Sequence, residues 1–575
     1  MILLGRIVGI DLGTSTSEVA ILVDGKPFVI PNHLGESITP SVVGISEEGE
    51  VIVGKEARDQ LLLKPNDTVI EVKRLMGSNQ TVSMGGKEYS PQKISSYILR
   101  YLIDCSSKYL GEEVERAVIT VPAYFSDDQR KSVVEAGKLA GITVERIINE
   151  PTAASLDYGI EHMEECRNIL VYDLGGGTLD VTILEMFEGV LEVKASSGNN
   201  KLGGKDFDQK IIDYLLENFK NKNNTDISKD IRAMMRLKDA AENCKIALSS
   251  SDEYEVALPF LANVNDTPVA LEEKITKEVF ESLINELIDS TQKQIEVALS
   301  DSGLKSENID MILLVGGSTR IPYVKKFIEK TLGQIPQSLV DPDLAVVRGA
   351  AVQAAILNDE LSSEKDIMIT DVCPYTLGLA VLDFIGGMPV HDAYDVIIPR
   401  NVTIPVRKEK IYGTVVDNQT SVEIKAYQGE YKRASQNNFL GKFKLDGIPP
   451  APAFEQKINV AFSYDVNGIL SIEGKIVSTG EKANLTVETT GVSLEDEVNL
   501  EDWVNSPLAK KYRAVIKKAE RLLKTENDDF EMFELENLLV SIKKSIIKND
   551  DTEIIDNLKD EISDLLMELS EDEDD

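Results

Sequence analysis

The sequence predicts an α/β domain first, then an antiparallel β domain and a short helical region. From residue 6 to about residue 358, apolar strand-like runs alternate with amphipathic stretches, which is the pattern of an α/β domain. From residue 373 to about 490 the hydrophobic period becomes two, and turn residues separate some of the runs. From residue 491 onward the apolar positions follow a helical period and acidic residues dominate.

Within the first region, the clearest strands are the apolar runs 116–121, 168–172 and 310–315. Helices are expected between them, at 127–140, 234–248 and 277–301. The short segment 364–372 follows; it is charged, then apolar, then acidic, with room for one extended strand. Because an exposed apolar linker is a liability, we expect it to dock in one state and to be free in another.

In the second region, alternating residues predict five strands, at 403–406, 420–427, 457–462, 468–472 and 483–487. Turn pairs such as Asp446-Gly447 and Asn467-Gly468 separate some of them, which indicates a compact antiparallel domain. The last five residues, 571–575, are all acidic, and we expect them to be disordered.

Composition and charge exclude several classes of function. The 575-residue chain has a net charge of −37, which argues against nonspecific binding of nucleic acid or anionic membranes. Its 4 cysteines and 3 histidines lack the spacing of a zinc site or a disulfide framework. The first residues do not form a signal peptide, and no apolar stretch is long enough to span a bilayer. We therefore expect a cytoplasmic protein of two or three domains, with neither nucleic acid nor membrane as a partner.

The same glycine hairpin occurs twice, at 10–14 (IDLGT) and 172–178 (YDLGGGT), and the flanks align without a gap, so that Glu18 falls on Asp180. Such a repeat indicates a duplicated structural unit. Small residues in each turn let backbone N–H groups approach an anion, whereas the preceding aspartate needs a cation between itself and a phosphate. Two facing hairpins of this kind predict a clamp for a nucleotide polyphosphate with a hydrated divalent metal.

Several longer strings identify a family. They are 119–125 (ITVPAYF), 148–154 (INEPTAA), 173–178 (DLGGGT), 314–322 (LVGGSTRIP), 349–355 (GAAVQAA) and 401–405 (NVTIP). In this order they resemble the DnaK-type seventy-kilodalton heat-shock chaperones, over roughly residues 6–490. Two further strings, 370–378 (TDVCPYTLG) and 462–468 (FSYDVNG), and the shortened C-terminal region are similar to the HscC-type branch.

The resemblance implies an actin-like two-lobed ATPase domain at 1–363, a linker at 364–372, a β-sandwich peptide-binding domain at 373–490 and a short helical lid at 491–575. It implies an ATP-dependent chaperone, which hydrolyses ATP to ADP and phosphate. ATP binding would close the lobes, dock the linker and open the peptide groove, and hydrolysis would trap an extended apolar client segment. The implied cofactors are ATP or ADP, Mg²⁺ and K⁺.

The resemblance also assigns roles in the ATPase domain. Lys73, Glu150, Asp173 and Thr178 match catalytic positions, and Asp11, Asp173 and Asp180 match cation ligands that act mostly through water. The nucleotide-binding positions are Asp11, Gly13, Thr14, Ser15, Gly175, Gly176, Gly177, Gly203, Gly204, Glu242, Lys245, Ser249, Gly316, Gly317, Ser318, Arg320 and Asp343. The relay to the peptide-binding domain matches Pro122, Arg130, Ile367, Met368, Ile369 and Asp371.

In the β domain, Leu379, Val381, Tyr412, Val415, Val422 and Ile424 align with the family's peptide groove, with Val422 at its central pocket. Each of these could instead be ordinary sandwich core. The segment 381–401 is longer than the bacterial norm, which leaves Leu382 and Ile385 as alternatives for the residue that arches over the client.

The ATPase domain departs from the family at four positions. Lys205 replaces the usual glutamate, Asn199 an aspartate and Thr16 an asparagine, and Ile246 lies where some members have an arginine. The first three changes bear on the rate of nucleotide exchange and on the contacts that hold the lobes together, more than on the hydrolysis reaction itself.

Two other functions remain open from sequence alone: a sugar or acid kinase with the same ATPase fold, and a non-hydrolysing holdase or exchange factor. The expected partners of a chaperone are unfolded peptide segments, a J-domain cochaperone and an exchange factor. We expect the protein itself to be a monomer. A short lid predicts weak retention of clients.

Overall fold

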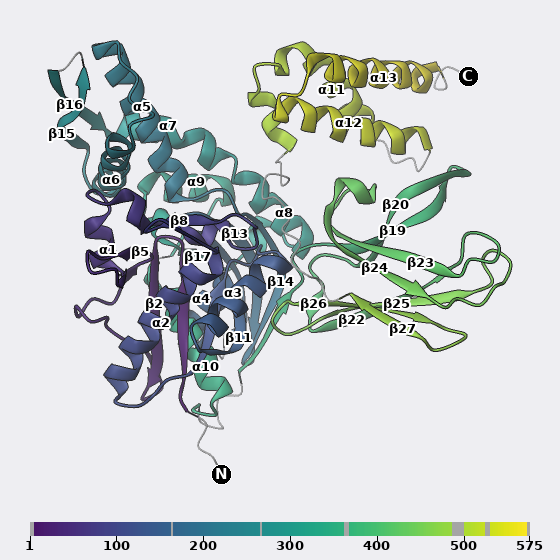
Figure 1. Cartoon of the computed structure of the whole chain (residues 1–575), viewed down its shortest axis with the longest axis horizontal. Coiled ribbons are helices and arrows are strands. Elements are labelled where there is room, and N and C mark those ends of the chain that lie inside the picture. The colour runs from purple at the N-terminus through teal and green to yellow at the C-terminus, as the bar shows by residue number, and fades with distance from the viewer. Residues whose placement is uncertain are drawn as a thin grey trace. The chain divides into compact units, whose positions relative to one another are not determined.

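The computed structural model describes residues 5–162, 165–264, 267–337, 339–361, 367–485, 500–523 and 530–571. They form two compact units, one of Met1–Pro374, Asn401–Pro405 and Tyr464–Ile469, the other of Tyr375–Arg400, Val406–Ser463 and Leu470–Asp575 (Figure 1). Part of the expected linker (364–366), the end of the expected β domain (486–490) and the acidic end (572–575) lie outside the described residues.

The first unit contains two mixed sheets that repeat one arrangement. In each, a parallel pair leads into an antiparallel hairpin: β10 pairs with β1 and β1 with β2, and β17 pairs with β12 and β12 with β13. The duplicated hairpins of the sequence are therefore equivalent parts of two sheets. The strands of the first sheet are β11 (Thr143–Asn149), β10 (Arg116–Val121), β1 (Ile7–Leu12), β2 (Thr16–Val23) and β3 (Lys26–Val29), with β4 (Thr39–Pro40) on β2. Those of the second are β17 (Met311–Val315), β12 (Arg167–Leu174), β13 (Leu179–Phe187), β14 (Val190–Asn199), β18 (Met368–Val372) and β21 (Thr403–Ile404).

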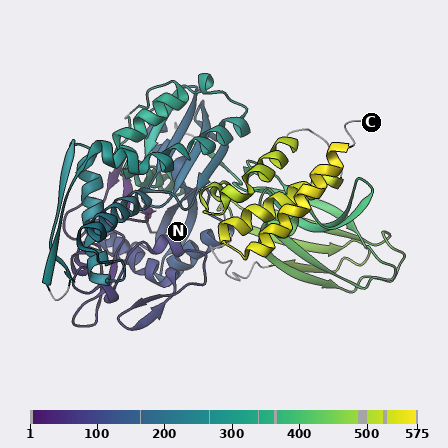
Figure 2. The ribbon, with the colours of Figure 1, turned by 90° about the horizontal axis from the view of Figure 1, so that it is seen from above.

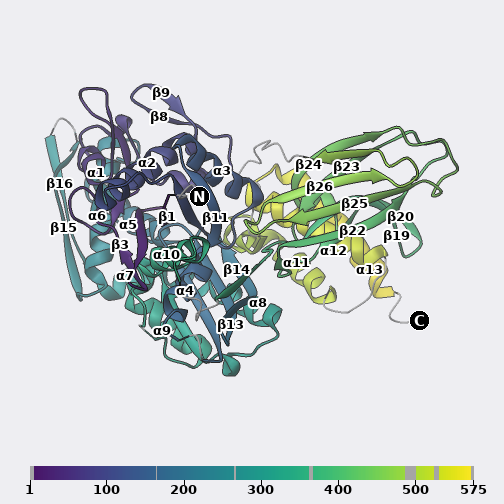
Figure 3. The same cartoon turned by 90° about the horizontal axis from the view of Figure 1, so that it is seen from below.

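Two helices lie between the sheets, α4 (Glu150–Gly159) and α10 (Ala345–Leu357), and pack against each other (Figure 3). Their backbones approach so closely that a Cβ atom on Gly349 would collide with the backbone of Ala153. A Cβ atom on Gly9 of β1 would collide with α10 in the same way. Glycine at these two positions therefore allows the helices and β1 to pack at backbone contact.

The first sheet with its flanking elements forms a first lobe, and the second sheet with its own forms a second lobe. The helix expected over 277–301 is two helices, because the chain turns at Thr291, whose hydroxyl accepts a hydrogen bond from the buried Tyr172 at 3.0 Å. The first-lobe helices are α1 (Lys55–Gln60), α2 (Pro91–Leu110) and α3 (Asp127–Leu139). The second-lobe helices are α5 (Gly204–Asn223), α6 (Ile231–Leu248), α7 (Lys277–Asp289), α8 (Gln292–Ser302) and α9 (Pro322–Leu332), with the hairpin β15 (Glu253–Val264) and β16 (Thr267–Thr276).

The described part of the linker forms strand β18, which adds to the second sheet between β14 and the short strand β21. β18 runs parallel to β14, with Ile369 opposite Leu191. Ile367 and Ile369 pack on the apolar core that includes Leu191 and Val193. The acidic end of the strand is buried, since Asp371 accepts hydrogen bonds from Asn149 Nδ2 at 2.7 Å and Thr152 Oγ1 at 3.0 Å. The linker is thus docked in this structure.

The second unit contains two four-stranded sheets. The first has the order β20 (Met388–Ile398), β19 (Leu377–Ile385), β23 (Ser421–Gln428) and β24 (Asn438–Asp446). The second has the order β22 (Val406–Gly413), β25 (Lys457–Tyr464), β26 (Leu470–Ile476) and β27 (Lys482–Leu485). β19 and β20 form a long hairpin that turns at Gly386 and Gly387, so the extra length noted in the sequence extends this hairpin.

Three helices, α11 (Ala509–Leu522), α12 (Phe530–Lys548) and α13 (Thr552–Glu571), lie side by side (Figures 1 and 2). Their shared core includes Trp503, Tyr512 and Ile542. α12 also packs on the hairpin of β19 and β20, where Phe533 is 3% exposed beside Val390. No helix in the described part of the chain is long and apolar enough to cross a membrane.

Candidate active site

Each of the duplicated hairpins carries two neighbouring carboxylates. Asp11 on β1 faces Glu18 on β2, and Asp173 on β12 faces Asp180 on β13. Directly opposed residues of an antiparallel pair have Cβ atoms about 4.5–5.5 Å apart on one face of the sheet. Three of the four are almost completely buried, with exposed fractions of 2% for Glu18, 5% for Asp173 and 1% for Asp180.

A cavity of about 390 Å³ lies between the two lobes of the first unit and contains most of the residues predicted to bind nucleotide. Its lining includes both glycine turns, the catalytic candidates and the residues predicted to contact adenosine. The predicted residues that line it are Asp11, Gly13, Thr14, Ser15, Lys73, Glu150, Asp173, Gly175, Gly176, Thr178, Glu242, Lys245, Ser249, Gly316, Gly317, Ser318, Arg320 and Asp343. Gly177, Gly203, Gly204 and Asp180 are not part of this lining.

Gly177, Gly203 and Gly204 lie behind the cavity wall and allow it to form. A Cβ atom on Gly203 would collide with the backbone of Gly177, and one on Gly204 would lie 2.6 Å from Ser318 Oγ. A Cβ atom on Gly176 would collide with Ser15 of the other turn. The two glycine turns therefore meet closely enough to enclose a ligand between their backbone groups.

Lys73 is buried within the cleft, although sequence alone gave no reason to expect a lysine inside. It lies on a 3₁₀ turn (Val72–Leu75), and its Nζ is 2.6 Å from Glu150 Oε1. The lysine side chain is 5% exposed and the glutamate side chain 11%. A buried ion pair of this kind depends on both partners, because loss of one leaves an uncompensated buried charge.

Burial and mutual repulsion raise the pKa values of the carboxyl groups around this pair. Burial, and next Glu150, raise the pKa of Asp11 to about 6 and that of Asp180 to about 7. Burial followed by the charge of Glu150 also raises the pKa of Asp173 well above its usual range. The arrangement therefore favours binding of a cation, which would compensate the ionised carboxylates.

The donor atoms fit hydrated Mg²⁺ or K⁺. Asp173 Oδ2 and Asp180 Oδ2 are buried without a hydrogen-bond partner. No three histidine, cysteine or acidic side chains converge on a metal position in the residues described. A cation here would complete its coordination with water or phosphate oxygens, which is typical of Mg²⁺ in nucleotide sites.

The side of the cavity predicted for adenosine is formed by α6 and by the turns after β17. Lys245 Nζ is 2.8 Å from Asp208 Oδ1, and Arg320 forms ion pairs with Asp341 and Asp343 at 2.9 and 2.6 Å. Ile246 is 61% exposed at this wall, so it offers an apolar surface where some relatives have an arginine.

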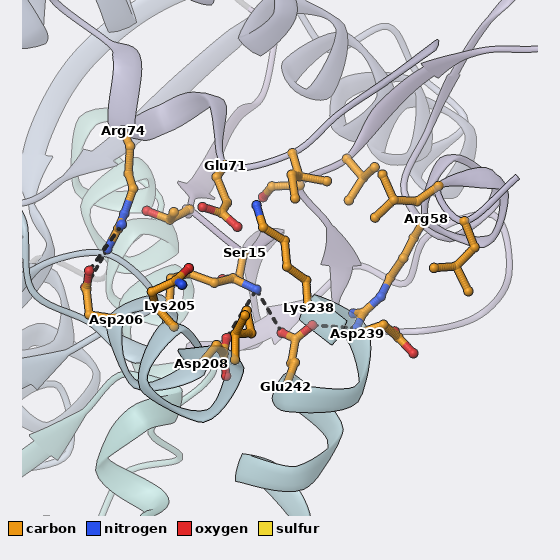
Figure 4. A pocket seen from close by; sticks show the side chains of 18 of the residues that line it. Ser15, Arg58, Glu71, Arg74, Lys205, Asp206, Asp208, Lys238, Asp239 and Glu242 are labelled. Carbon is orange, nitrogen blue, oxygen red and sulfur yellow. Dashed lines mark hydrogen bonds and ion pairs between the residues drawn. The ribbon is translucent and has the colours of Figure 1, made fainter. Parts of the chain in front are cut away.

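Ion pairs that the sequence did not reveal join the lobes beside this cavity (Figure 4). Arg58 of the first lobe is 2.8 Å from Glu242 of the second, and Arg74 is 2.7 Å from Asp206. They line a second cavity of about 660 Å³. Lys205 Nζ is 3.3 Å from the same Glu242, so the departure from glutamate adds a cation to this group. Glu242 therefore has two cationic neighbours besides its predicted place at the nucleotide.

Two of the predicted relay residues, Arg130 and Asp371, are joined through Asn149 within the first unit. Arg130 is buried and donates to Asn149 Oδ1 at 2.7 Å, and Asn149 donates to Asp371 of the linker. Arg130 also donates to the carbonyl of Asn467 at 3.5 Å. Pro122 is buried nearby, at the start of the turn that precedes α3. Asn149 was not predicted as a relay residue, although it lies within one of the family strings.

The residues predicted for the peptide groove differ in their burial. Leu379 and Ile424 are buried, while Val415 is 43% exposed. Val381, Tyr412 and Val422 are half-buried, and the Tyr412 hydroxyl donates to Asp395 Oδ2 at 2.7 Å. Burial of Leu379 and Ile424 is equally compatible with the alternative of sandwich core. Of the two arch candidates, Ile385 packs in the cluster formed with α12, which contains Phe533.

Comparisons with known proteins agree with this architecture. The family model described as Hsp70 protein matches residues 7–575. The chain is 45% identical over 568 residues to the chaperone protein DnaK of Thermotoga petrophila, covering 98% of this chain and 92% of the relative. It is 45% identical over 568 residues to the DnaK of Thermosipho melanesiensis, covering 95% of this chain and 93% of the relative. The chain therefore belongs to the Hsp70 family and is an ATP-dependent chaperone, whose ATP hydrolysis is coupled to its chaperone function.

Proposed function

We propose that the cavity between the lobes holds the polyphosphate of ATP or ADP, with Thr14 and Ser15 and the backbone of both glycine turns on the phosphates. Glu242, Lys245 and Ser249, with the turn at Gly316–Ser318 and with Arg320 and Asp343, would surround adenosine. Convergence of these residues on one cavity supports the assignment. Asp11, Asp173 and Asp180 would hold Mg²⁺ and K⁺ mostly through water, which would offset phosphate charge.

The ion pair of Lys73 and Glu150 is the observation that carries the catalytic proposal. Lys73 would neutralise the oxygens of the terminal phosphate, since an ammonium group is a compact point charge. Glu150 and Thr178 would orient the attacking water for an in-line displacement. In the absence of nucleotide, Lys73 and Glu150 would neutralise each other. The buried ammonium group would then have a counter-ion before the phosphate binds.

Lys73→Ala tests this proposal. We expect the variant to bind ATP but to hydrolyse it roughly 10²–10³-fold more slowly in single turnover, the usual cost of losing one group that stabilises transition-state charge. Glu50→Ala, an exposed position on the same lobe, is the control. Normal turnover by the Lys73 variant would rule out the assignment.

We further propose that 1–363 is the ATPase domain, 364–372 the linker, 373–490 the peptide-binding domain and 491–575 the lid. The path from Pro122 and Arg130 through Asn149 to Asp371 would report the nucleotide state to the linker at Ile367, Met368 and Ile369. Strand addition of β18 to the second sheet supports this role, because docking and release change the edge of that sheet. Leu379, Val381, Tyr412, Val415, Val422 and Ile424 would form the groove for an extended apolar peptide. Leu382 would arch over the client, because Ile385 packs with α12.

Membership of the Hsp70 family favours this function over the sugar or acid kinase and over the non-hydrolysing holdase. We propose a cytoplasmic monomer of the HscC-type branch, served by a J-domain cochaperone and an exchange factor. The two branch-like strings support the branch. Steady-state ATP hydrolysis with a panel of J-domain proteins and apolar peptides tests the partners. Stimulation by a J-domain protein and a peptide together is expected, and indifference to the whole panel would refute the proposal.

A further inference from the structure

Glu18 is a buried acidic residue of the nucleotide site that the proposed mechanism does not use. It lies on β2 directly opposite Asp11 on β1. The second hairpin has the same arrangement, with Asp180 opposite Asp173. The two lobes thus present two equivalent carboxylate pairs, of which only the second has both members assigned to cations above.

The Glu18 side chain is built into the site and points into its cavity. The residue is 2% exposed and lines the cavity together with Asp11. Its Oε1 atom is buried without a hydrogen-bond partner. Its other contact is with Thr16, whose hydroxyl donates to the carboxylate. One departure from the family, Thr16 in place of an asparagine, therefore contacts Glu18 directly.

No protein cation in the described part of the chain compensates this pair. The ammonium group of Lys73 acts electrostatically on Glu18, but it forms its ion pair with Glu150, at 2.6 Å. Arg320 is engaged by Asp341 and Asp343. Asp343 itself adds to the negative charge around Glu18. Glu18 and Asp11 therefore face each other across the hairpin, with Glu18 Oε1 buried and unpartnered.

We propose that Asp11 and Glu18 together bind a divalent cation of the Mg²⁺ class, separate from any cation held by Asp173 and Asp180. A pair of carboxylates carries a charge of about −2 when ionised, which a divalent ion neutralises. One or two carboxylates completed by water is the environment that Mg²⁺ prefers. Because both ligands belong to one hairpin of the first lobe, the site does not depend on closure of the lobes or on nucleotide.

Counting bound Mn²⁺, a paramagnetic substitute for Mg²⁺, in the nucleotide-free full-length protein tests the proposal. Electron paramagnetic resonance gives the free Mn²⁺, and thus the bound number, for the wild type, Glu18→Gln, Asp180→Asn and the exposed control Glu50→Gln. We expect Glu18→Gln to bind one Mn²⁺ fewer than the wild type and Glu50→Gln to bind the same number. Asp180→Asn should still bind the Mn²⁺ ion held by Asp11 and Glu18, which would show that the two hairpins bind cations independently.

Thermal unfolding supplies a second readout. With chelator, Glu18→Gln should have a higher Tm than the wild type, because the carboxylate repulsion is gone, and Mg²⁺ should raise its Tm less. If Glu18→Gln retains the wild-type Mn²⁺ number and the wild-type response of Tm to Mg²⁺, Glu18 is a protonated buried carboxyl and the proposal is wrong. It is also wrong if the difference appears only with nucleotide. This proposal rests on the proposed nucleotide site, but neither readout needs ATP. A variant that no longer hydrolyses ATP but still binds the wild-type number of Mn²⁺ ions would therefore bear on a different proposal, that of the catalytic role, and leave the cation site standing.

Discussion

The ion pairs between the lobes predict how fast nucleotide leaves the cleft. The double variant Arg58→Ala, Arg74→Ala removes the pairs to Glu242 and Asp206, both of which cross from the first lobe to the second. Neither arginine lines the nucleotide cavity itself. The variant therefore weakens lobe closure and leaves the phosphate and adenosine walls intact.

The exposure of the side chains sets the size of the effect. Arg58 and Glu242 have side chains 38% and 19% exposed, and Arg74 and Asp206 are each 27% exposed. Partly exposed pairs of this kind contribute about 0.5–1 kcal/mol each. Loss of both, about 1–2 kcal/mol, corresponds to roughly 5- to 30-fold faster opening. Added salt should reduce the difference, because the Debye length falls from about 10 Å at 0.1 M to about 3 Å at 1 M.

Displacement of a fluorescent ADP analogue by excess unlabelled ADP, followed by stopped flow, measures the release rate. Arg100→Ala is the matched control, since Arg100 pairs with Asp104 at 3.0 Å within one helix of the first lobe. We expect the double variant to release ADP 5- to 30-fold faster at about 0.05 M salt and the control to match the wild type. If the double variant releases ADP at low salt within twofold of the wild-type rate, the ion pairs of Arg58 and Arg74 do not control the opening of the lobes.

Three further predictions concern other parts of the chain. Burial, then Asp127, raise the pKa of Asp128 to about 6 from 3.8, so its destabilising ionised form appears as the pH rises through about 6. Asp128→Asn should therefore increase the free energy of unfolding at pH 8 by up to roughly 3 kcal/mol, with a higher Tm. Near pH 4 the variant and the wild type should have the same Tm. A Tm difference that does not depend on pH would contradict this prediction. Val422→Ser should weaken binding of an apolar peptide by about 1–2 kcal/mol in fluorescence anisotropy, whereas Val477→Ser, at a 52% exposed valine of the same unit, should not. Phe533→Ala should speed peptide release from the ADP state, because this buried side chain packs α12 on the β19–β20 hairpin; unchanged release would show that the lid does not retain the client.

Local pattern predicted much of the fold, and tertiary contacts explain the main exceptions. The hairpins around Asp11 and Asp173 were readable because their repeat and their β-branched flanks are contiguous in sequence. The break at Thr291 was not, since it depends on a hydrogen bond from Tyr172, more than a hundred residues away. The linker strand was expected, but its partner strand β14 follows only from the folded sheet.

The candidate site shows the same division. Residues inside the glycine turns could be named from the strings, whereas Arg58 and Arg74 have no local signal, because each pairs with an acid on the other lobe. Glu18 had a signal, since the repeat aligns it with Asp180, yet only the structure shows that it is buried with an unpartnered oxygen. Lys73 would have been placed on the surface without the resemblance, and its burial comes from the turn that carries it.

The docked linker also has a consequence for aggregation. In the proposed cycle, release of β18 would leave β14 with open backbone groups at Leu191 and its neighbours, to which an unfolded client or a second copy could add. Lys194 lies on β14, 2.8 Å from Glu192 and 2.9 Å from Glu185. Charged side chains along an outer strand disfavour such additions. The charged side chains of β14 would therefore protect this edge from such additions while the linker is released.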